Sequence, residues 1–146
     1  MKKIFFLFFF GVHFYCFSAL QAQNSDILKA QETVKNFFGS IAALDVEMMS
    51  GYVATDFLLL EDGEVMKLND LVVEINKIKT YNVTRVNTIN FLDAKQHDDV
   101  IWLAYDNTAD LSMADQKMQL KWLESAVLIK ERGQWKIELL HATSKH

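Results

Sequence analysis

Proline is absent from this chain of 146 residues, and cysteine occurs once, at position 16. One cysteine cannot form an internal disulfide or supply a zinc site built from several thiolates. Glycine is also scarce, with five residues, and no glycine-rich phosphate loop is present. The order of serine, histidine and aspartate typical of serine hydrolases is missing as well. The sequence therefore predicts no nucleotide binding, no serine hydrolysis, no metal site and no bound cofactor.

Positive charge is in the minority. The chain has 15 Lys and Arg residues against 19 Asp and Glu residues, and its formal net charge at pH 7 is −4. No cluster of basic residues occurs along it. Because nucleic acids are bound mainly through their phosphates, this charge balance excludes a nucleic-acid partner.

The N-terminal segment has the order of an export signal. Lys2 and Lys3 precede an apolar run over residues 4–17, and the small residue Ala22 follows. This order predicts cleavage after Ala22, so that residues 1–22 are a signal peptide and residues 23–146 form a single mature domain. A membrane anchor is the alternative, but the run is shorter than the roughly 20 residues that cross a bilayer. We therefore expect a periplasmic or extracellular protein without membrane contact after cleavage.

Cys16 raises a second alternative, which is lipid attachment after processing at this residue. Lipoprotein processing favours small residues before the cysteine, whereas Phe14 and Tyr15 precede it here. Cleavage after Ala22 would also remove Cys16 and leave a mature domain without a thiol. The sequence therefore favours a soluble exported domain over a lipoprotein.

Two helices are predicted at the start of the mature domain. Apolar residues recur at spacings of three and four, namely Ile27, Ala30, Val34, Phe37, Ile41, Leu44 and Met48. This periodicity predicts an amphipathic helix of about five turns that begins at Asn24 or Ser25. A break at residues 43–45 separates a second, short helix over residues 46–53.

The rest of the chain is mostly of strand type. Residues 57–60 read as a buried strand, the dipeptide Asp62-Gly63 predicts a hairpin turn, and Asn69 is placed to cap a third helix. Alternating patterns then predict strands over residues 81–92, 100–111, 118–130 and 135–143. Helices followed by an antiparallel meander predict an α+β fold, in which three helices cover the concave face of a bent sheet.

Two predicted turns set the expected pairing of the last three long strands. With Arg132-Gly133 and Ala114-Asp115 as two-residue loops, Glu124 is placed opposite both Tyr105 and His141. One sheet face then has an apolar end and a polar end. The apolar end carries Ile101, Leu103, Ala126, Leu128, Ile137 and Leu139, and the polar end carries Tyr105, Asn107, Trp122, Glu124, His141 and Thr143.

This distribution is typical of a cone with a packed base and a polar, partly open mouth. A carboxylate beside an imidazole can act as an acid–base pair, so Glu124 and His141 are the candidate catalytic residues. Tyr105, Asn107 and Trp122 are candidate ligand-binding residues, as is Tyr52 from the second helix. The alternative is that the Tyr–Glu–His row only satisfies polar groups that line a cavity.

The order of these elements resembles the nuclear transport factor 2-like superfamily, and most closely its SnoaL-like and uncharacterised secreted branches. The matching motifs are Ala43-Leu-Asp45, Tyr52-Val-Ala-Thr-Asp-Phe57, Glu61-Asp-Gly63, Leu68-Asn-Asp-Leu71, Trp122-Leu-Glu-Ser125, Gly133-Gln-Trp-Lys-Ile137 and His141-Ala-Thr143. The resemblance covers residues 26–146 and implies a cone of curved sheet wrapped around a long helix. It implies no single activity, because this scaffold carries isomerases, cyclases, dehydratases, hydrolases and non-catalytic binders.

Two activities of the superfamily can be compared with this chain. For its steroid isomerases, the resemblance implies a catalytic carboxylate near Glu61 and Asp62 and a tyrosine from the first helix, where Phe37 and Phe38 stand here. Its epoxide hydrolases use an arginine between two aspartates, and the sequence shows no acidic partner for Arg85. Both activities are therefore disfavoured by the sequence.

Two hypotheses for function remain. The first is an exported domain that binds a small apolar ligand in a cone-shaped cavity, and the second is a SnoaL-like lyase, isomerase or cyclase that uses Glu124 and His141. The outer sheet face is expected to carry Val100, Trp102, Leu123, Val127, Ile129 and Leu140. Because so much apolar surface usually marks a contact, we expect a homodimer through this face.

Overall fold

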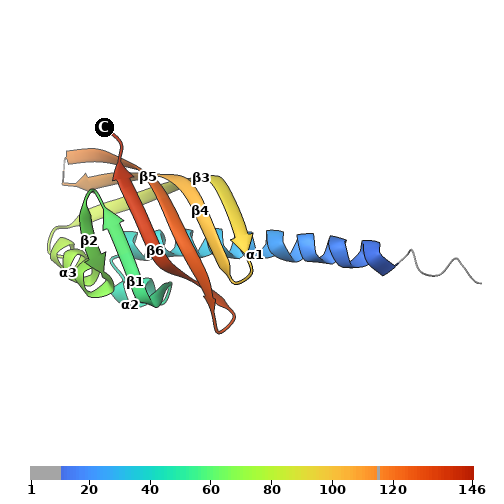
Figure 1. Cartoon of the computed structure of the whole chain (residues 1–146). Helices are drawn as coiled ribbons and strands as arrows, with labels where there is room; N and C mark the ends of the chain where they lie inside the picture. Colours follow the sequence, from blue (N-terminus) through green and yellow to red (C-terminus); the bar gives the residue numbers. More distant parts are fainter. Residues whose placement is uncertain (1–10, 115) are drawn as a thin grey trace, which may run out of the picture.

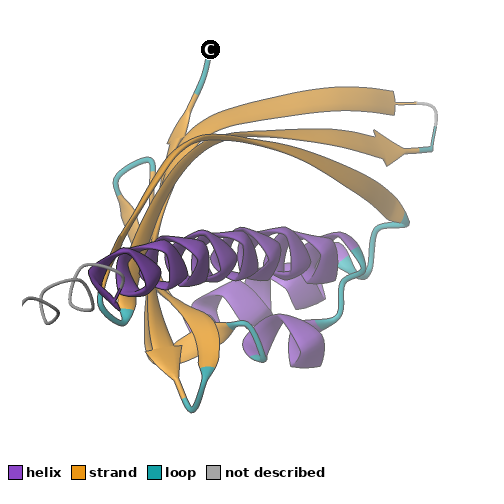
Figure 2. Cartoon of the chain, turned by 90° about the vertical axis from the view of Figure 1, so that its right-hand side faces the viewer, coloured by secondary structure: helices purple, strands orange, loops and turns teal. Residues whose placement is uncertain are grey.

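Three helices lie against the concave face of a single bent sheet (Figures 1 and 2). This computed structural model describes residues 11–114 and 116–146, and the expected basic start of the export signal lies outside them. The elements are α1 (Gly11–Ala42), α2 (Val46–Ser50), β1 (Val53–Glu61), β2 (Glu64–Lys67), α3 (Leu68–Ile78), β3 (Val83–His97), β4 (Val100–Met113), β5 (Gln116–Glu131) and β6 (Gln134–Ser144). The predicted α+β architecture is confirmed.

The six strands are ordered β2-β1-β6-β5-β4-β3 across the sheet. Strands β3 to β6 form the predicted antiparallel meander. Strand β1 pairs with β6 in parallel, so that Glu61 lies opposite Ala142. The sequence did not indicate this pairing, which joins the first strand to the last and makes β6 an interior strand.

Two tight turns give the hairpins their register. Asp62 and Gly63 have φ angles of 47° and 93°, and Arg132 and Gly133 have 50° and 81°. Positive φ at both central residues is the geometry that a two-residue hairpin loop requires, and glycine adopts it without strain. Both hairpins occur where they were predicted, with Glu61 opposite Glu64 and Glu131 opposite Gln134.

The pairing of the long strands is irregular at two places. The β3–β4 register shifts between Phe91 and Asp93, and the β5–β6 register shifts between Val127 and Leu128. An extra residue in one strand bends that strand and increases its local twist. Figure 2 shows the result, in which the long strands arch over α1.

The starts of two helices differ from prediction. Helix α1 runs without interruption from Gly11, so Asn24 and Ser25 lie inside it rather than at its beginning. Helix α3 begins one residue before Asn69, and its first turn is capped by Asp70, whose Oδ2 accepts a hydrogen bond of 2.9 Å from the Lys67 amide. A carboxylate in the first turn fits because the amide groups there have no helical partner.

The core lies between α1 and the base of the sheet. Val34, Phe37 and Ile41 of α1 pack with Leu103 and Leu128, both of which are fully buried. Each such side chain contributes about 1.5–3 kcal/mol relative to an exposed one. Three aromatic contacts extend this core toward the middle of the sheet, namely Phe37–Phe57, Phe38–Tyr105 and Phe91–Tyr105, with centroids 6.0, 6.3 and 5.6 Å apart.

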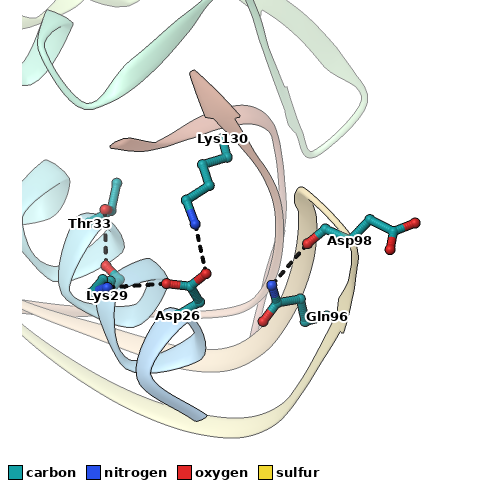
Figure 3. A network of polar contacts seen from close by, with 6 residues as sticks. All are labelled: Asp26, Lys29, Thr33, Gln96, Asp98 and Lys130. Atoms are coloured by element: carbon teal, nitrogen blue, oxygen red, sulfur yellow. Dashed lines mark hydrogen bonds and ion pairs between the residues drawn. The ribbon is translucent and has the colours of Figure 1, made fainter. Parts of the chain in front are cut away.

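A polar contact fixes α1 to β5 near the base (Figure 3). Lys130 Nζ lies 2.8 Å from Asp26 Oδ2, and Lys29 Nζ lies 3.2 Å from Asp26 Oδ1. The hydrogen bond from Lys130 lowers the pKa of Asp26. Thr33 also donates to the Trp135 carbonyl at 3.3 Å, so α1 is joined to both strands of the last hairpin.

None of the described helices is both long enough and apolar enough to cross a membrane.

Candidate functional site

Polar side chains form a band across the middle of the concave face, just beyond the apolar base. Glu124 of β5 is 5% exposed and Asn107 of β4 is 1% exposed, so both are removed from water. Glu124 pairs with Tyr105, and Leu103 pairs with Ala126, both as predicted. The pairing continues in the predicted register as far as Met113 opposite Gln116, so it was correct along the whole pair.

A chain of hydrogen bonds runs through this band from β3 to β5. Arg85 Nε donates to Asn87 Oδ1 at 2.9 Å, and Asn87 Nδ2 donates to Asn107 Oδ1 at 2.8 Å. Asn107 Nδ2 then donates to Glu124 Oε1 at 3.0 Å. Each amide therefore has a fixed orientation, because its oxygen accepts from one neighbour and its nitrogen donates to the next.

The Glu124 carboxyl group is poised to titrate near neutral pH. Burial raises its pKa from 4.5 to about 7, and this effect outweighs the hydrogen bond from Asn107 and the nearby Tyr105 hydroxyl, both of which lower it. The Tyr105 hydroxyl faces Glu124 without good hydrogen-bond geometry. Among the described residues, Tyr105 Oη and Glu124 Oε2 both lack a hydrogen-bond partner. A second acceptor position on Glu124 is thus left open.

Arg85 lies within electrostatic reach of two carboxylates, but it forms no ion pair with either of them. Glu124 and Glu61 both attract its guanidinium, although burial acts in the opposite direction and lowers the pKa of Arg85. The guanidinium carbon lies 5.6 Å from the centre of the Trp122 ring, within the range of a cation–π contact. Trp122 was expected to contact a ligand, and in the structure its ring contacts this arginine.

Glu61 reaches the same band through the parallel pairing of β1 with β6. Ala142 lies opposite Glu61 on one side and opposite Glu124 on the other, so only a methyl group separates the two acids along this row. Burial and the neighbouring Asp62 raise the pKa of Glu61, while a hydrogen bond from Trp122 lowers it. Glu61 therefore belongs to this polar band, although the sequence did not predict it as a site residue.

His141 does not join Glu124, and this prediction is wrong. The β5–β6 pairing steps by one residue on β5 and by two on β6 after Leu128–Ile137, so Glu138 is the extra residue of a bulge. His141 then pairs with Ser125 and is exposed. The same shift reverses the predicted faces of three other residues, with Leu139 and Thr143 outside and Leu140 inside.

Tyr52 also lies apart from the band. It is half-buried and lines a separate groove of about 530 Å³ between α1, the α2–β1 loop and the β5–β6 hairpin. Its carbonyl accepts a hydrogen bond of 2.9 Å from the Ile137 amide. The structure therefore gives Tyr52 a position at the edge of the core and does not bring it to Glu124.

A pocket of about 660 Å³ opens beyond the polar band, between the end of α1, α3 and the far ends of β3, β4 and β5. Its lining is mainly apolar and includes Ile41, Leu44, Ile75, Ile78, Leu111 and Leu120. Arg85 and Lys117 are the charged residues among those that line it. A polar mouth was expected, whereas the pocket walls are apolar and the polar groups lie one layer deeper.

Three residues of the band were not predicted as site residues: Arg85, Asn87 and Glu61. Arg85 and Asn87 are at inward-facing positions of β3, between the apolar residues Val83 and Ile89. A continuous apolar face would be expected at these positions. Polar residues at inward positions of a strand are the signal that could have identified two of them. The described residues contain no cluster of three His, Cys, Asp or Glu side chains arranged to hold a metal ion.

Comparison with known proteins agrees with this architecture. The family model of the SnoaL-like domain matches residues 30–144. The chain belongs to this family. No curated protein matches this SnoaL-like chain in sequence.

Solved structures of the same fold are distant in sequence. This SnoaL-like domain resembles a ketosteroid isomerase-like protein from Erwinia carotovora atroseptica, with a TM-score of 0.70, 11% identity and coverage of 84% of this chain and 98% of that one. It resembles a conserved protein from Planctomyces limnophilus with a TM-score of 0.77, 10% identity and the same coverage of 84% and 98%. A nuclear transport factor 2-like protein from Cytophaga hutchinsonii has a TM-score of 0.67, 16% identity and coverage of 84% and 98%. These likenesses confirm the predicted fold, and the family match over residues 30–144 confirms the predicted SnoaL-like resemblance.

Proposed function

We propose that this domain binds a small, mainly apolar organic molecule in the pocket beside the polar band. The observation that carries this proposal is the pocket itself, whose volume of about 660 Å³ lies within the range of roughly 300–1,000 Å³ typical of ligand sites. An apolar body would contact Leu111 and Leu120, and a polar end would reach Arg85 at the inner wall. Apolar walls with a few fixed polar groups are what such sites need for affinity and orientation.

A variant that fills the pocket tests this proposal. Leu111 lines the pocket from β4 and is half-buried, so Leu111→Trp should occupy part of the volume. Val73 on α3 is 52% exposed and does not line the pocket, which makes Val73→Trp a matched control. Compounds from a panel that raise the melting temperature of the wild type should lose this effect in Leu111→Trp and keep it in Val73→Trp. Equal responses of both variants, with folding checked by circular dichroism, would place the ligand elsewhere.

A second candidate function is proton transfer by Glu124. A buried carboxyl with a pKa of about 7 can both accept and donate a proton at neutral pH, and its Oε2 has no partner among the described residues. The ketosteroid isomerase-like name of one structural neighbour fits chemistry of this kind. Binding is better supported than catalysis, because Glu124 is 5% exposed and is not among the residues that line the pocket.

One pair of variants distinguishes ligand binding from proton transfer by Glu124. Glu124→Gln keeps the shape of the side chain but cannot act as a base, so any lyase or isomerase activity should fall by about 10²-fold or more. Glu138 carries the same group on the bulge of β6, and Glu138→Gln should retain activity. Ligand binding without turnover in the wild type would support the binding function alone.

The proposed site of action is outside the cytoplasm, and its support is the signal-like order of residues 1–22. Mass spectrometry of the native protein should find an N-terminus at Gln23. A mature protein that begins at Met1, or that carries lipid on Cys16, would contradict this part of the proposal.

A homodimer through the outer sheet face is also part of the proposal. Val100 and Leu123 are 41% and 47% exposed on this face, and Trp102, Val127 and Ile129 are half-buried beside them. Leu140 no longer belongs to the face, because the bulge turns it inward. Sedimentation should show a dimer at micromolar concentration that Leu123→Asp converts to a monomer, because a charge there would be buried without a partner. A monomeric wild type would contradict the dimer.

A further inference from the structure

We infer that the ligand of the pocket carries a carboxylate, which Arg85 binds, and that its binding is coupled to uptake of a proton by Glu124. The ligand would thus be a hydrophobic monocarboxylate, with its apolar body in the pocket and its anionic end at the inner wall. This inference rests on the proposed binding function and adds the chemical class of the ligand.

The position of Arg85 supports an anionic ligand group. Arg85 lines the pocket, its Nε is held by Asn87, and its guanidinium lies over Trp122. No ion pair joins it to a carboxylate of any described residue. The terminal guanidinium nitrogens are therefore oriented and available, and their planar fork matches the two oxygens of a carboxylate.

The walls around Arg85 exclude other classes of ligand. Ten of the pocket residues are apolar. A ligand with several charges would therefore bury some of its charges without a polar partner. A neutral ligand would leave the half-buried guanidinium without an ion-pair partner among the described residues. Lys117, on β5, is the other cation that lines the pocket.

The coupling to Glu124 follows from the charges that surround it. Glu61 from β1 raises the pKa of Glu124, and Arg85 from β3 lowers it. Tyr105 faces it from β4, Ala142 adjoins it on β6, and the α1 side of the site presents the Phe38 ring to Tyr105. A ligand carboxylate at Arg85 would cancel the attraction of Arg85 and add a negative charge. Both changes favour the protonated form of Glu124, so bound ligand should raise its pKa further.

The first arm of the test compares two probes that differ only in their polar end. Decanoate and decanamide have the same alkyl chain, and calorimetry of the full-length mature protein at pH 6.5 gives both affinities. A hydrogen bond to a charged group strengthens binding by about tenfold or more, so decanoate should bind at least that much more tightly. Equal affinities would overturn the carboxylate inference and leave the binding pocket intact. If neither probe binds, both the pocket function and the inference fall.

The second arm assigns the effect to Arg85. Arg85→Met should reduce the affinity for decanoate to that for decanamide, while Arg85→Lys, which keeps the charge but loses the fork, should fall between them. Lys121→Met is the matched control, since it removes one positive charge from an exposed position of β5 outside the pocket, and it should change the affinity less than threefold. An equal loss in Lys121→Met and Arg85→Met would show general electrostatic attraction and contradict the inference.

The third arm measures the coupling through pH. Decanoate itself stays ionised above pH 6, because carboxyl groups in water titrate at about pH 4 to 5. Its affinity for the wild type should therefore be highest at the acidic end and fall as pH rises from 6 to 8. Glu124→Gln should remove this slope and bind decanoate more tightly than the wild type at pH 8. A wild-type affinity that is independent of pH would contradict the coupling to Glu124.

Discussion

The two halves of the concave face share their strands but differ in what fills them. At the base, Ile101, Leu103 and Leu128 are fully buried against α1. Beyond Tyr105, the same inward positions of β4 carry a buried amide, a small alanine and then the half-buried Leu111 of the pocket wall. The base is closely packed and therefore contributes most of the stability. The open half contains polar groups and an unfilled pocket instead.

The two halves also use charge in opposite ways. At the base, Asp26 and Lys130 are partly exposed and form an ion pair that lowers the pKa of the acid. In the open half, Glu124 is buried without an ion pair, and its pKa is raised to about 7. The first arrangement favours the folded state at neutral pH, whereas the second opposes it. A buried ionisable group whose shifted pKa destabilises the fold at neutral pH is typical of a functional site.

The largest difference is expected from truncation of a leucine in each half. Leu103→Ala should lower the free energy of unfolding by about 2–5 kcal/mol, because it leaves a cavity in a closely packed region. Leu111→Ala, on the same strand and face, should cost about 1 kcal/mol or less, because its side chain borders an open pocket. Urea denaturation of both variants measures the difference. Similar losses would show that the open half is packed as firmly as the base.

The next effect is the dependence of stability on pH. Because the pKa of Glu124 is raised from 4.5 to about 7, its contribution is fully present below pH 4.5 and is lost as pH rises through 7. The wild type should lose up to about 3 kcal/mol across this interval, since one pKa unit corresponds to about 1.4 kcal/mol. Glu124→Gln should largely remove this loss, and Glu138→Gln should preserve it. A Glu124→Gln curve parallel to that of the wild type would mean that Glu124 is not buried as described.

A smaller change is expected when the Tyr105 hydroxyl is removed. Tyr105 lowers the pKa of Glu124, so Tyr105→Phe should move the Glu124 titration to higher pH, by less than one unit. Stability at pH 6 should change little, since Tyr105 Oη has no partner among the described residues to lose. Carboxyl NMR of the labelled protein can follow this titration. A shift to lower pH would contradict the contact between the two side chains.

The smallest effect should come from the ion pair at the base. Asp26→Asn removes a partly exposed pair, and such pairs contribute little to stability. The lowered pKa of Asp26 gives the opposite sign to Glu124, because its contribution is present above the ordinary pKa of 3.8 and is lost as pH falls. Wild type and Asp26→Asn should thus converge in acid. Denaturant titrations at pH 3 and pH 6 test this convergence.

The sequence predicted the register wherever local turns determine it. Asp62-Gly63 and Arg132-Gly133 gave correct hairpins, and the predicted turn after Met113 placed Glu124 opposite Tyr105. The predicted alternation of inward and outward side chains is wrong beyond Glu138. A bulge adds one residue to β6 there, and no turn residue in the sequence marks it. Two successive leucines, Leu139 and Leu140, mark this point, since strict alternation cannot place both of them inside.

The candidate site was harder to predict because its members come from separate parts of the chain. Glu61 meets Glu124 only through the parallel pairing of β1 with β6, which local sequence patterns do not encode. Arg85 and Asn87 lie on β3, two strands before the strand that carries Glu124. A chain of hydrogen bonds through Asn107 connects them to Glu124. Glu124, Tyr105, Asn107 and Trp122 could be predicted because one hairpin carries them all.

The interior position of β6 has a consequence for the order in which the protein can fold. Residues 134–144 follow every other element in the chain, yet they lie between β1 and β5 in the finished sheet. A nascent chain that has emerged only as far as β5 can form the β3–β5 meander, but it cannot attach β1 and β2 to it. The sheet closes only after β6 has been synthesised, and such long-range pairings form slowly. A chain that completes its fold this late stays unfolded for longer, as the proposed export of the domain would require.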